Sequence, residues 1–360
     1  MNARIKLTPV DTWFFRDGTP FNADESNLDI SSVFPPSNRT IVGATRAALA
    51  RELGWNGTAE WDDKIIERLG DRDDLSPLRY TGPRLMKSEK ILFPTPSNLI
   101  KEKDGGELDF LKPREDTIRC DIGEKLVPMT ILDGIKSLKN TFLTEKDFKK
   151  VLKCERPSPS DIISSDELWK EELRDGIKID EETSTTKDDA LYTTKRIRLK
   201  EGASVSMYIE NAPSELKEID SLTIGGESGM AYMDVEEIEE DGLIPPMPNI
   251  EENNGKVRFT VNFLTPTRLK NNDLYDILEQ ITGATVISAC IDKPIWIGGW
   301  NSLKNEPLDL EPFYSAGSVL FCEIAEKDID KIKSLHGEKI GEYTDFGFGE
   351  IAIGKWKMED

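Results

Sequence analysis

The stretch FPPSNRTIVGATRAALA, residues 34–50, combines residue types that can hold an anion. Two prolines stop the preceding strand. Ser37 or Asn38 can then cap a helix whose first turn presents free N–H groups and a partial positive charge. Small residues let a phosphate approach the backbone closely, and arginines add cationic donors. The pattern predicts a phosphate site formed by Ser37, Arg39, Thr40, Gly43 and Arg46. The alternative is that the alanines only pack the helix against a sheet and the arginines are solvated.

A second cationic stretch, LYTTKRIRLKEG at residues 191–202, stands out because the whole chain is acidic, with a formal net charge of −21. Acidic side chains concentrate in residues 155–190 and 234–254, whereas residues 1–54 carry balanced charge. Such acidic runs are typical of solvated surface. The net charge therefore does not exclude a local site for an anion such as an RNA phosphate.

Two glycine-rich segments and one aromatic segment are further candidates. Gly225–Gly226 and Gly347–Gly349 (GFG) are turns where the backbone can approach a ligand or another loop, although plain turns explain them equally well. The segment DFGFGEIAI only superficially resembles an RNA-recognition strand, because Glu350 stands where an aromatic residue would stack. The aromatic residues at 13–15 are typical of a core. Arg16, in the turn that follows them, is the candidate contact there.

Catalytic chemistry finds little support in the residue types. The chain has one histidine, His336, near the end of a predicted surface helix, where it is interpreted as solvated. GxSxG, HExxH and Walker motifs are absent, and the carboxylates lack a metal-ligand spacing, so we expect neither a metal nor a cofactor. The four cysteines form no CxxC pair, and the sequence shows neither a signal peptide nor a membrane-spanning stretch. We expect a cytoplasmic protein that is not an enzyme.

The elements that position these residues occur in the same order twice. The C-terminal third predicts β-α-β-β-α-β, and the N-terminal part repeats this order with insertions. The tripeptide LTP occurs at 7–9 and again at 264–266, which supports a duplication. The predicted C-terminal elements are strands at 256–269, 284–300, 316–324 and 347–357 with helices at 271–283 and 327–337. The fold class is therefore α+β, with two tandem ferredoxin-like (RRM-like) domains.

The domain limits follow from composition. We expect an N-terminal domain at 1–240 with an insertion at about 105–200, an acidic proline-containing linker at 241–255, and a C-terminal domain at 256–360. The insertion predicts helical patches at 131–153 and 161–175. Two β-prone arms, 177–186 and 191–199, then flank a polar turn, which predicts a protruding hairpin with cations on its return arm.

Taken together and in order, these stretches resemble the RAMP proteins of CRISPR effector complexes, and within them the family of third subunits of the Cmr (type III-B) complex. The resemblance runs along the chain, apart from inserts at about 101–176 and 236–255. It rests on LTPVDTWFFRDGTPF (7–21), SSVFPPSNRTIVGATRAALA (31–50), TGPRL (81–85), ILFPTPSNL (91–99), DDALYTTKRIRLKEG (188–202), LTIGGESGMA (222–231), FLTPTRL (263–269), KPIWIGGWN (293–301), PFYSAGSV (312–319) and GFGEIAIGKW (347–356).

The resemblance implies a non-catalytic RNA-binding subunit with a thumb-like hairpin in its first RAMP domain. Such a subunit caps the 5′ handle of the crRNA and docks the large polymerase-like subunit and the first copy of the backbone subunit. It therefore meets target RNA indirectly, in antiviral defence, and it has no membrane partner. The implied RNA contacts are Arg16, Ser37, Arg39, Thr40, Gly43, Arg46, Tyr192, Lys195, Arg196, Arg198, Lys200, Gly225, Gly226, Gly347 and Gly349.

Two alternatives stay open at this point. A stand-alone endoribonuclease that processes CRISPR transcripts could use the same fold, since fold does not determine activity. A purely protein-binding scaffold would leave guide RNA retention insensitive to the charge of Arg196 and Arg198.

Overall fold

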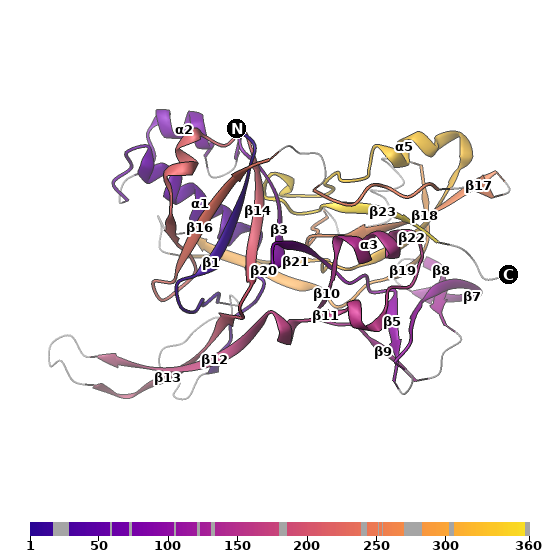
Figure 1. Ribbon diagram of the computed structural model, residues 1–360, viewed down its shortest axis with the longest axis horizontal. Coiled ribbons are helices and arrows are strands. Elements are labelled where there is room, and N and C mark those ends of the chain that lie inside the picture. Colours follow the sequence, from indigo (N-terminus) through magenta and orange to yellow (C-terminus); the bar gives the residue numbers. More distant parts are fainter. Residues whose placement is uncertain are drawn as a thin grey trace. The chain divides into compact units, whose positions relative to one another are not determined.

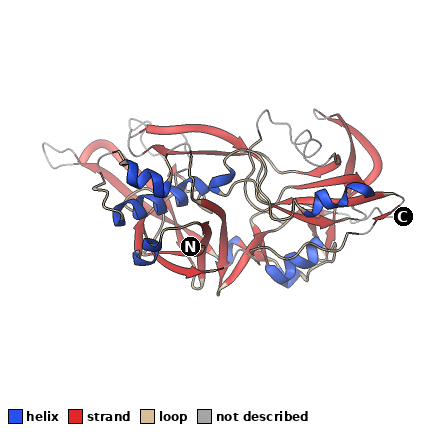
Figure 2. Cartoon of the chain, turned by 90° about the horizontal axis from the view of Figure 1, so that it is seen from above, coloured by secondary structure: helices blue, strands red, loops and turns tan. Residues whose placement is uncertain are grey.

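A computed structural model provides the structure of this protein. It describes residues 1–16, 29–57, 60–71, 74–103, 106–120, 123–130, 134–179, 186–238, 243–250, 252–253, 255–269, 283–301 and 306–356. The fold is α+β, with mostly antiparallel sheets and short helices (Figure 2). None of the described helices combines the length and apolar content that a membrane crossing requires.

The chain folds into two compact units, each assembled from separated segments. The first unit contains Met1–Ser88, Asp166–Ile238 and Trp296–Glu311, and the second contains Glu89–Ser165, Glu239–Ile295 and Pro312–Asp360. Residues 89–165, which lie within the predicted N-terminal domain, thus pack with the C-terminal segments. The continuous domains 1–240 and 256–360 and the linker between them remain a prediction about how the chain is organised.

An antiparallel sheet forms the centre of the first unit (Figure 1). Its strand order is β16 (Met230–Glu237), β1 (Ala3–Pro9), β14 (Ala203–Glu210) and β3 (Arg79–Lys87), and β15 (Ser221–Thr223) pairs with the outer side of β16. In β1 the apolar residues Ala3, Ile5 and Leu7 are buried and alternate with half-buried neighbours. This period of two is the pattern of a strand with one face in the core.

The helices of this unit are stabilised by their N-caps and by the apolar faces that they bury. α1 (Asn38–Glu52) buries Ile41, Val42 and Leu49 and contacts β3 and β15. α2 (Asp63–Leu69) starts where the side chain of Asp62 accepts a hydrogen bond from the N–H of Ile65, as an N-cap does. A short 3-10 helix, η3 (Ser214–Glu218), follows β14.

Two ribbons complete the first unit. β12 (Trp169–Ile179) and β13 (Thr186–Leu199) form a long antiparallel hairpin that projects from the sheet, and β2 (Asp29–Ile30) pairs in parallel with β13 (Figure 1). β20 (Ile295–Asn301) and β21 (Glu306–Phe313) form a two-stranded ribbon whose larger part belongs to this unit.

The second unit is built on another antiparallel sheet, with the order β23 (Ile351–Lys355), β18 (Lys256–Phe263), β22 (Val319–Ala325) and β19 (Thr285–Cys290). β17 (Glu252–Asn253) pairs with β18. One face carries a core around Phe259, Phe263 and Ile353, which is joined by α5 (Ile329–Lys333) and the 3-10 turn η5 (Glu326–Asp328). The other face receives α3 (Glu145–Leu152), whose Phe148 and Leu152 pack with Leu264.

Shorter strands complete the second unit. Their bounds are β4 (Lys90–Pro94), β5 (Leu99–Glu102), β6 (Leu108–Phe110), β7 (Lys112–Cys120), β8 (Gly123–Met129), β9 (Ile135–Ser137), β10 (Thr141–Thr144) and β11 (Ile163–Ser164). The 3-10 turns η1 (Pro159–Asp161), η2 (Ser165–Glu167) and η6 (Thr344–Phe346) connect elements.

The structure corrects several expected elements. The helical patch expected at 161–175 is wrong: the segment forms 3-10 turns and the start of β12, since pairing with β13 outweighs local helix propensity. In the described part of the patch expected at 131–153, residues 134–153, only the end is helical, as α3. The strand expected at 284–300 is two strands, β19 and β20. The helix predicted at 271–283 falls almost entirely outside the described residues.

Candidate nucleic-acid interface

The start of α1 has the geometry of a capped helix. Ser37 is the N-cap, and its Oγ accepts a hydrogen bond from the N–H of Thr40 at 3.3 Å and contacts the Thr40 hydroxyl at 2.9 Å. Asn38 is buried and donates from Nδ2 to the carbonyl of Gly82 at 2.6 Å, which fixes the first turn to β3. The first turn carries no acidic residue. Its polarity therefore suits an anion.

Arg39 and Arg46, two of the three arginines of α1, are engaged by other groups of the protein rather than solvated. Arg46 is 8% exposed and donates to the carbonyls of Leu69, Gly70 and Asp71 at 3.1, 2.9 and 2.6 Å, so it ties α1 to the segment after α2. Burial lowers its pKa. Arg39 donates to a carboxylate oxygen of Glu311 at 2.6 Å. Gly43 is open, since nothing lies within 4 Å of the position of a Cβ. A phosphate at this helix would meet N–H groups and Gly43 before Arg46.

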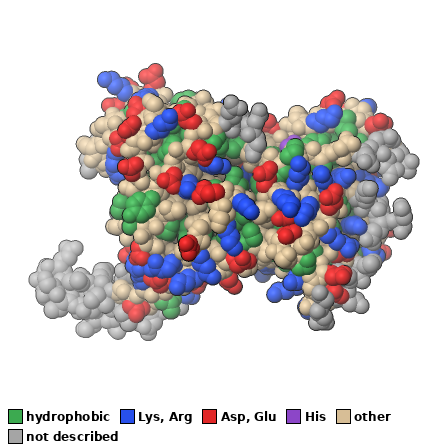
Figure 3. All heavy atoms as spheres, viewed as in Figure 1, with side chains coloured by type: hydrophobic (Ala, Val, Ile, Leu, Met, Phe, Trp, Pro, Cys, Tyr) green, Lys and Arg blue, Asp and Glu red, His purple; other side chains and the backbone are tan. Residues whose placement is uncertain are grey.

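The hairpin register sorts the cationic residues onto two faces. Directly paired residues in an antiparallel ribbon project to the same side. The pairs Glu172–Arg196, Lys170–Arg198 and Arg174–Thr194 share one face, which therefore gathers two basic residues from each arm. Lys195 pairs with Leu173 and lies on the opposite face. Figure 3 shows Lys and Arg side chains gathered beside the base of the hairpin.

Lys170 and Arg174 were missed as candidates because a helix was expected there. The alternation in WKEELRDGIKI of β12 is the signal that could have placed them opposite the return arm. Tyr192 pairs with Gly176 in this ribbon, but its side chain lies outside the described part. Lys200 follows the end of β13, is exposed, and donates from its backbone N–H to Leu168.

A network of ion pairs anchors the basic face. Arg198 donates to Glu172 at 2.5 Å and to Asp11 at 2.9 Å, and Arg174 donates to the same two carboxylates. The hydrogen bond from Arg198 is the main reason that the pKa of Glu172 falls to about 2, and Arg174 is the main reason that the pKa of Asp11 is lowered. The carboxylates in turn raise the pKa of Arg198. The guanidinium groups are thus held in place, about a third exposed.

The segment after β1 and the first glycine loop meet at this hairpin base. Trp13 exchanges two backbone hydrogen bonds with Ile197, at 2.9 and 2.7 Å. Gly226 donates to the carbonyl of Phe14 at 2.8 Å, and Arg196 lies 3.5 Å from Glu227. Four stretches that the sequence singles out therefore belong to one unit: the segment up to Arg16, the start of α1, the hairpin and the loop at 225–226. The first, third and fourth of these stretches are in direct contact.

Aromatic packing holds this arrangement. Trp13 and Phe15 are buried, as expected for core residues, and Phe34 lies against both Trp13 and Trp169 with its ring centroid 4.8 Å from that of Trp169. Arg16 itself is exposed and forms a backbone bridge with Ser32. The hairpin base is thus fixed to the segment that precedes α1 by an apolar cluster.

The glycines at 347 and 349 belong to the second unit. Both have left-handed backbone conformations, with φ of +88° and +79°. A Cβ on Gly349 would lie 1.9 Å from the carbonyl oxygen of Ile340, and its N–H donates to Pro266 at 2.9 Å. The close approach that the sequence predicts at Gly349 is therefore to the protein's own backbone.

The interpretation of His336 as a solvated residue is wrong. Its Nδ1 accepts a hydrogen bond from the N–H of Ile353 at 3.1 Å, and its Nε2 donates to the carbonyl of Pro245 at 2.9 Å. Burial lowers the pKa of the ring, which keeps it neutral. A ring with both nitrogens engaged in backbone bonds is a structural element rather than a ready base. Among the described residues, no group of three His, Cys, Asp or Glu side chains is placed to hold a metal.

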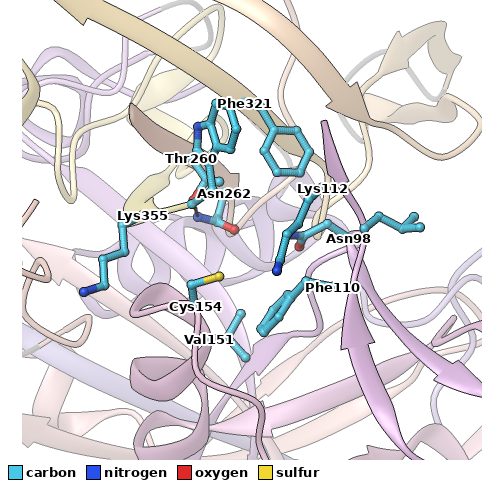
Figure 4. A pocket seen from close by; sticks show the side chains of 11 residues that line it. Asn98, Phe110, Lys112, Val151, Cys154, Thr260, Asn262, Phe321 and Lys355 are labelled. Atoms are coloured by element: carbon cyan, nitrogen blue, oxygen red, sulfur yellow. Dashed lines mark hydrogen bonds between the residues drawn. The ribbon is translucent and has the colours of Figure 1, made fainter. Parts of the chain in front are cut away.

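A small cavity in the second unit is too small for a nucleotide. It is lined by Asn98, Lys112, Cys154, Asn262 and Trp356 among others, and Figure 4 shows Asn98, Lys112 and Asn262 turned toward the same space. Its volume of about 10 Å³ is room for one water molecule. The Oδ1 atom of Asn98 is buried without a hydrogen-bond partner in the described structure. A water donor would satisfy it.

Comparisons with known proteins agree with the sequence resemblance. A family model described as "CRISPR-associated protein (Cas_Cmr3)" matches residues 5–356. A chain of the type III-B Cmr-beta complex bound to cognate target RNA has a TM-score of 0.54 at 18% identity, and one from the complex with target RNA and AMPPnP has 0.55 at 16%. Each alignment covers 99% of both chains, and at this identity it shows a shared fold. No curated protein matches the sequence.

Proposed function

Because this chain belongs to the Cas_Cmr3 family of CRISPR-associated proteins, we propose that it is a non-catalytic RNA-binding subunit of a type III-B Cmr effector complex. In this proposal it caps the 5′ handle of the crRNA in the cytoplasm. It also bridges the large polymerase-like subunit to the backbone subunits. Family membership supports a place in a type III effector, and the capping and bridging roles are our proposal.

One observation carries the RNA-binding role: the basic face of the hairpin base, formed by Lys170, Arg174, Arg196 and Arg198. Guanidinium groups held by carboxylates, yet still partly exposed, can exchange those partners for phosphate oxygens without reorganising. The glycine loop at 225–226 contacts the chain after β1 beside this face, and the capped start of α1 belongs to the same unit. A phosphate backbone could run along these groups.

The fold of the family supports the same proposal. We propose that each unit contains one ferredoxin-like domain. In both sheets the fourth strand of the motif lies beside the first, and the third separates the first from the second: β16-β1-β14-β3 and β23-β18-β22-β19. That order is the one that β-α-β-β-α-β chains adopt in this fold. RNA-binding RRM domains use the same order.

The non-catalytic assignment is favoured over an endoribonuclease by the state of His336. Its two nitrogens are committed to backbone groups, so a metal-independent cleavage mechanism would lack its usual base. Incubation of the purified chain with repeat RNA tests this. We expect no cleaved product, and cleavage that His336→Ala abolishes would contradict the assignment.

A titration with labelled RNA tests the binding role. The complex reconstituted with an RNA that carries the repeat-derived 5′ handle is compared with one that carries a scrambled handle. We expect Arg196→Ala/Arg198→Ala to weaken binding about tenfold or more and to reduce the salt slope by about 1 for each phosphate that is no longer neutralised. Arg68→Ala removes an arginine that pairs with Glu215 in the same unit, and it serves as the matched control. Equal affinity for both handles, or equal weakening in both variants, would contradict handle capping.

A further inference from the structure

The small cavity of the second unit gathers a thiol, an ammonium group and two amides around one space. Its lining includes Asn98, Lys112, Cys154 and Asn262, and Figure 4 shows these four side chains turned toward the same space. Lys112 begins β7, Cys154 follows the C-cap of α3, and Asn262 lies in β18, so folding brings them together. We call this space the thiol cavity.

The end of α3 determines where the thiol lies. Cys154 has a left-handed backbone conformation, with a φ of +61°, at a position after a helix that glycine usually occupies. Its N–H donates to the carbonyl of Val151 at 2.8 Å, and the N–H of Glu155 donates to the carbonyl of Lys150 at 2.9 Å. A non-glycine residue in this conformation is strained, and such residues are typical of functional sites. Two backbone hydrogen bonds therefore hold Cys154 at the wall of the thiol cavity.

An unpartnered acceptor faces the thiol cavity. Asn98 is 7% exposed, and its buried Oδ1 accepts no hydrogen bond from the described residues. A buried acceptor without a donor is costly, so the cavity favours an occupant with an O–H or N–H group. Its volume of about 10 Å³ admits one water molecule or one hydroxyl group. The cavity therefore suits a single oxygen atom that donates a hydrogen bond.

Cys154 differs from the buried cysteines of the same unit. Cys290 and Cys322 are 8% and 0% exposed, and burial raises the pKa of both thiols, that of Cys290 to about 12. Such thiols are inert, because the thiolate is the nucleophile. Cys154 is partly exposed. The carboxyl end of α3 disfavours a negative charge there, whereas the ammonium group of Lys112 favours one. Among the cysteines whose side chains the structure describes, Cys154 is thus the one suited to react.

We propose that Cys154 is a site of oxidation by hydroperoxides, and that the thiol cavity holds its sulfenic acid. The thiolate sulfur attacks one oxygen of hydrogen peroxide, and the S–O bond forms as the O–O bond breaks. Sulfur loses two electrons, and hydroxide leaves with the electron pair of the O–O bond. The new hydroxyl group donates a hydrogen bond to Oδ1 of Asn98, and its oxygen accepts one from Lys112. This inference does not depend on the proposed RNA binding.

Oxidation of the full chain by hydrogen peroxide, followed by dimedone, a cyclic diketone that traps sulfenic acids, tests the proposal. Peptide mass spectrometry measures the label at each cysteine. All proteins carry Cys120→Ser, because the side chain of Cys120 lies outside the described part. The variants are Lys112→Met and Asn98→Leu. The matched control is Lys153→Met, which removes a lysine next to Cys154 that is not part of the cavity lining.

We expect dimedone to label Cys154 and to leave Cys290 and Cys322 unlabelled until denaturant unfolds the chain. Lys112→Met should slow the labelling about threefold to tenfold, because the thiolate loses its cation. Asn98→Leu should lower the trapped yield by about the same factor, because a sulfenic acid without its hydrogen bond proceeds to sulfinic acid. Lys153→Met should change either quantity less than about twofold.

The two buried cysteines also report on folding. A variant in which Cys290 and Cys322 stay unlabelled has kept its second unit folded, so its result at Cys154 is valid. Because Lys112→Met and Asn98→Leu alter different sides of the thiol cavity, either variant tests the site if the other folds poorly.

Three results would overturn the inference. In the first, Cys154 of the wild type gains no label at a peroxide concentration that oxidises N-acetylcysteine. In the second, the wild type forms sulfinic acid at Cys154 and no trapped sulfenic acid. In the third, Cys154 is labelled alike in the wild type and in both variants, which would make it an exposed thiol that its surroundings do not influence.

Discussion

The two glycine loops, one in each unit, use the same backbone device in different surroundings. Gly225 and Gly349 have φ values of +77° and +79°. A Cβ would lie 2.5 Å from the carbonyl oxygen of Phe14 in the first case and 1.9 Å from that of Ile340 in the second. In each loop a glycine N–H also donates to the chain in or after an LTP segment, Gly226 to Phe14 and Gly349 to Pro266.

The residues beside the loops differ. In the first unit Glu227 follows the glycines and lies 3.5 Å from Arg196, at the partly exposed base of the hairpin. In the second unit Glu350 is 1% exposed, and the neighbouring Phe348 packs against Phe313 with ring centroids 4.8 Å apart. The left-handed glycines therefore hold each loop against the backbone of its own unit. The candidate RNA surface depends on the side chains next to the loop.

The largest effect is expected from Gly349→Ala. The left-handed backbone and the contact with the carbonyl of Ile340 should together cost about 2–4 kcal/mol of the unfolding free energy of the second unit. Gly225→Ala should cost about 1–3 kcal/mol in the first unit, since its contact is less close. Chemical unfolding with hydrogen exchange at β23 and β16 measures both. Equal stability of Gly349→Ala and wild type would contradict a structural role for the second loop.

Lowering the pH from about 7 to 5 should reduce the stability of the second unit and leave that of the hairpin base in the first unit unchanged. The pKa of His336 in the folded chain lies below its ordinary value of 6.5, so the unfolded chain binds the proton first as pH falls. Its contribution is full above 6.5 and is lost as pH falls toward the folded value. The loss is about 0.5–1.5 kcal/mol, the usual worth of one hydrogen bond.

The Glu172 pairs contribute fully above pH 4.5, and their contribution is lost progressively as pH falls from there to about 2. Unfolding midpoints of the second unit at pH of about 7 and 5 should therefore differ, while hydrogen exchange at the hairpin base should not change over that range. His336→Gln is the control that should abolish the difference. Midpoints of the wild type that do not depend on pH would show that His336 is not held as described.

A smaller effect sharpens the assignment of the basic face. Arg174→Gln should weaken handle RNA binding about 3–10-fold, because Arg174 shares the face of Arg198. Lys195→Gln removes a cation from the opposite face and should change the affinity less than about twofold. Filter binding at two salt concentrations compares them. The reverse ranking would move the RNA to the other face of the hairpin.

The smallest effect is expected at Gly43. Its Cβ position is open and lies within α1, so Gly43→Ala should raise the unfolding free energy by about 0.5–1 kcal/mol. If a phosphate approaches the backbone here, handle affinity should fall although the protein is more stable. Unchanged affinity would show that no phosphate approaches the backbone at Gly43.

Much of this architecture could be predicted from local patterns. Alternation in β1 and in β13 and the cap at Ser37 follow from side-chain period and backbone preference, which act over a few residues. The candidate site was harder to predict from the sequence. The sequence singles out Arg196 and Arg198, but the carboxylate partners of Arg198, Asp11 and Glu172, lie 187 and 26 residues away from it in the chain.

The sequence by itself therefore determined the strands β1 and β13, the capped start of α1 and the cationic return arm of the hairpin. Tertiary structure alone decided that Arg46 is buried against the carbonyls of Leu69 and Gly70, that Lys170 and Arg174 join the basic face, and that both ring nitrogens of His336 bind backbone groups. The physical reason is the distance along the chain over which each kind of interaction acts. Local propensity depends on neighbours in the chain, whereas burial, charge pairing and strand register depend on residues that only folding brings together.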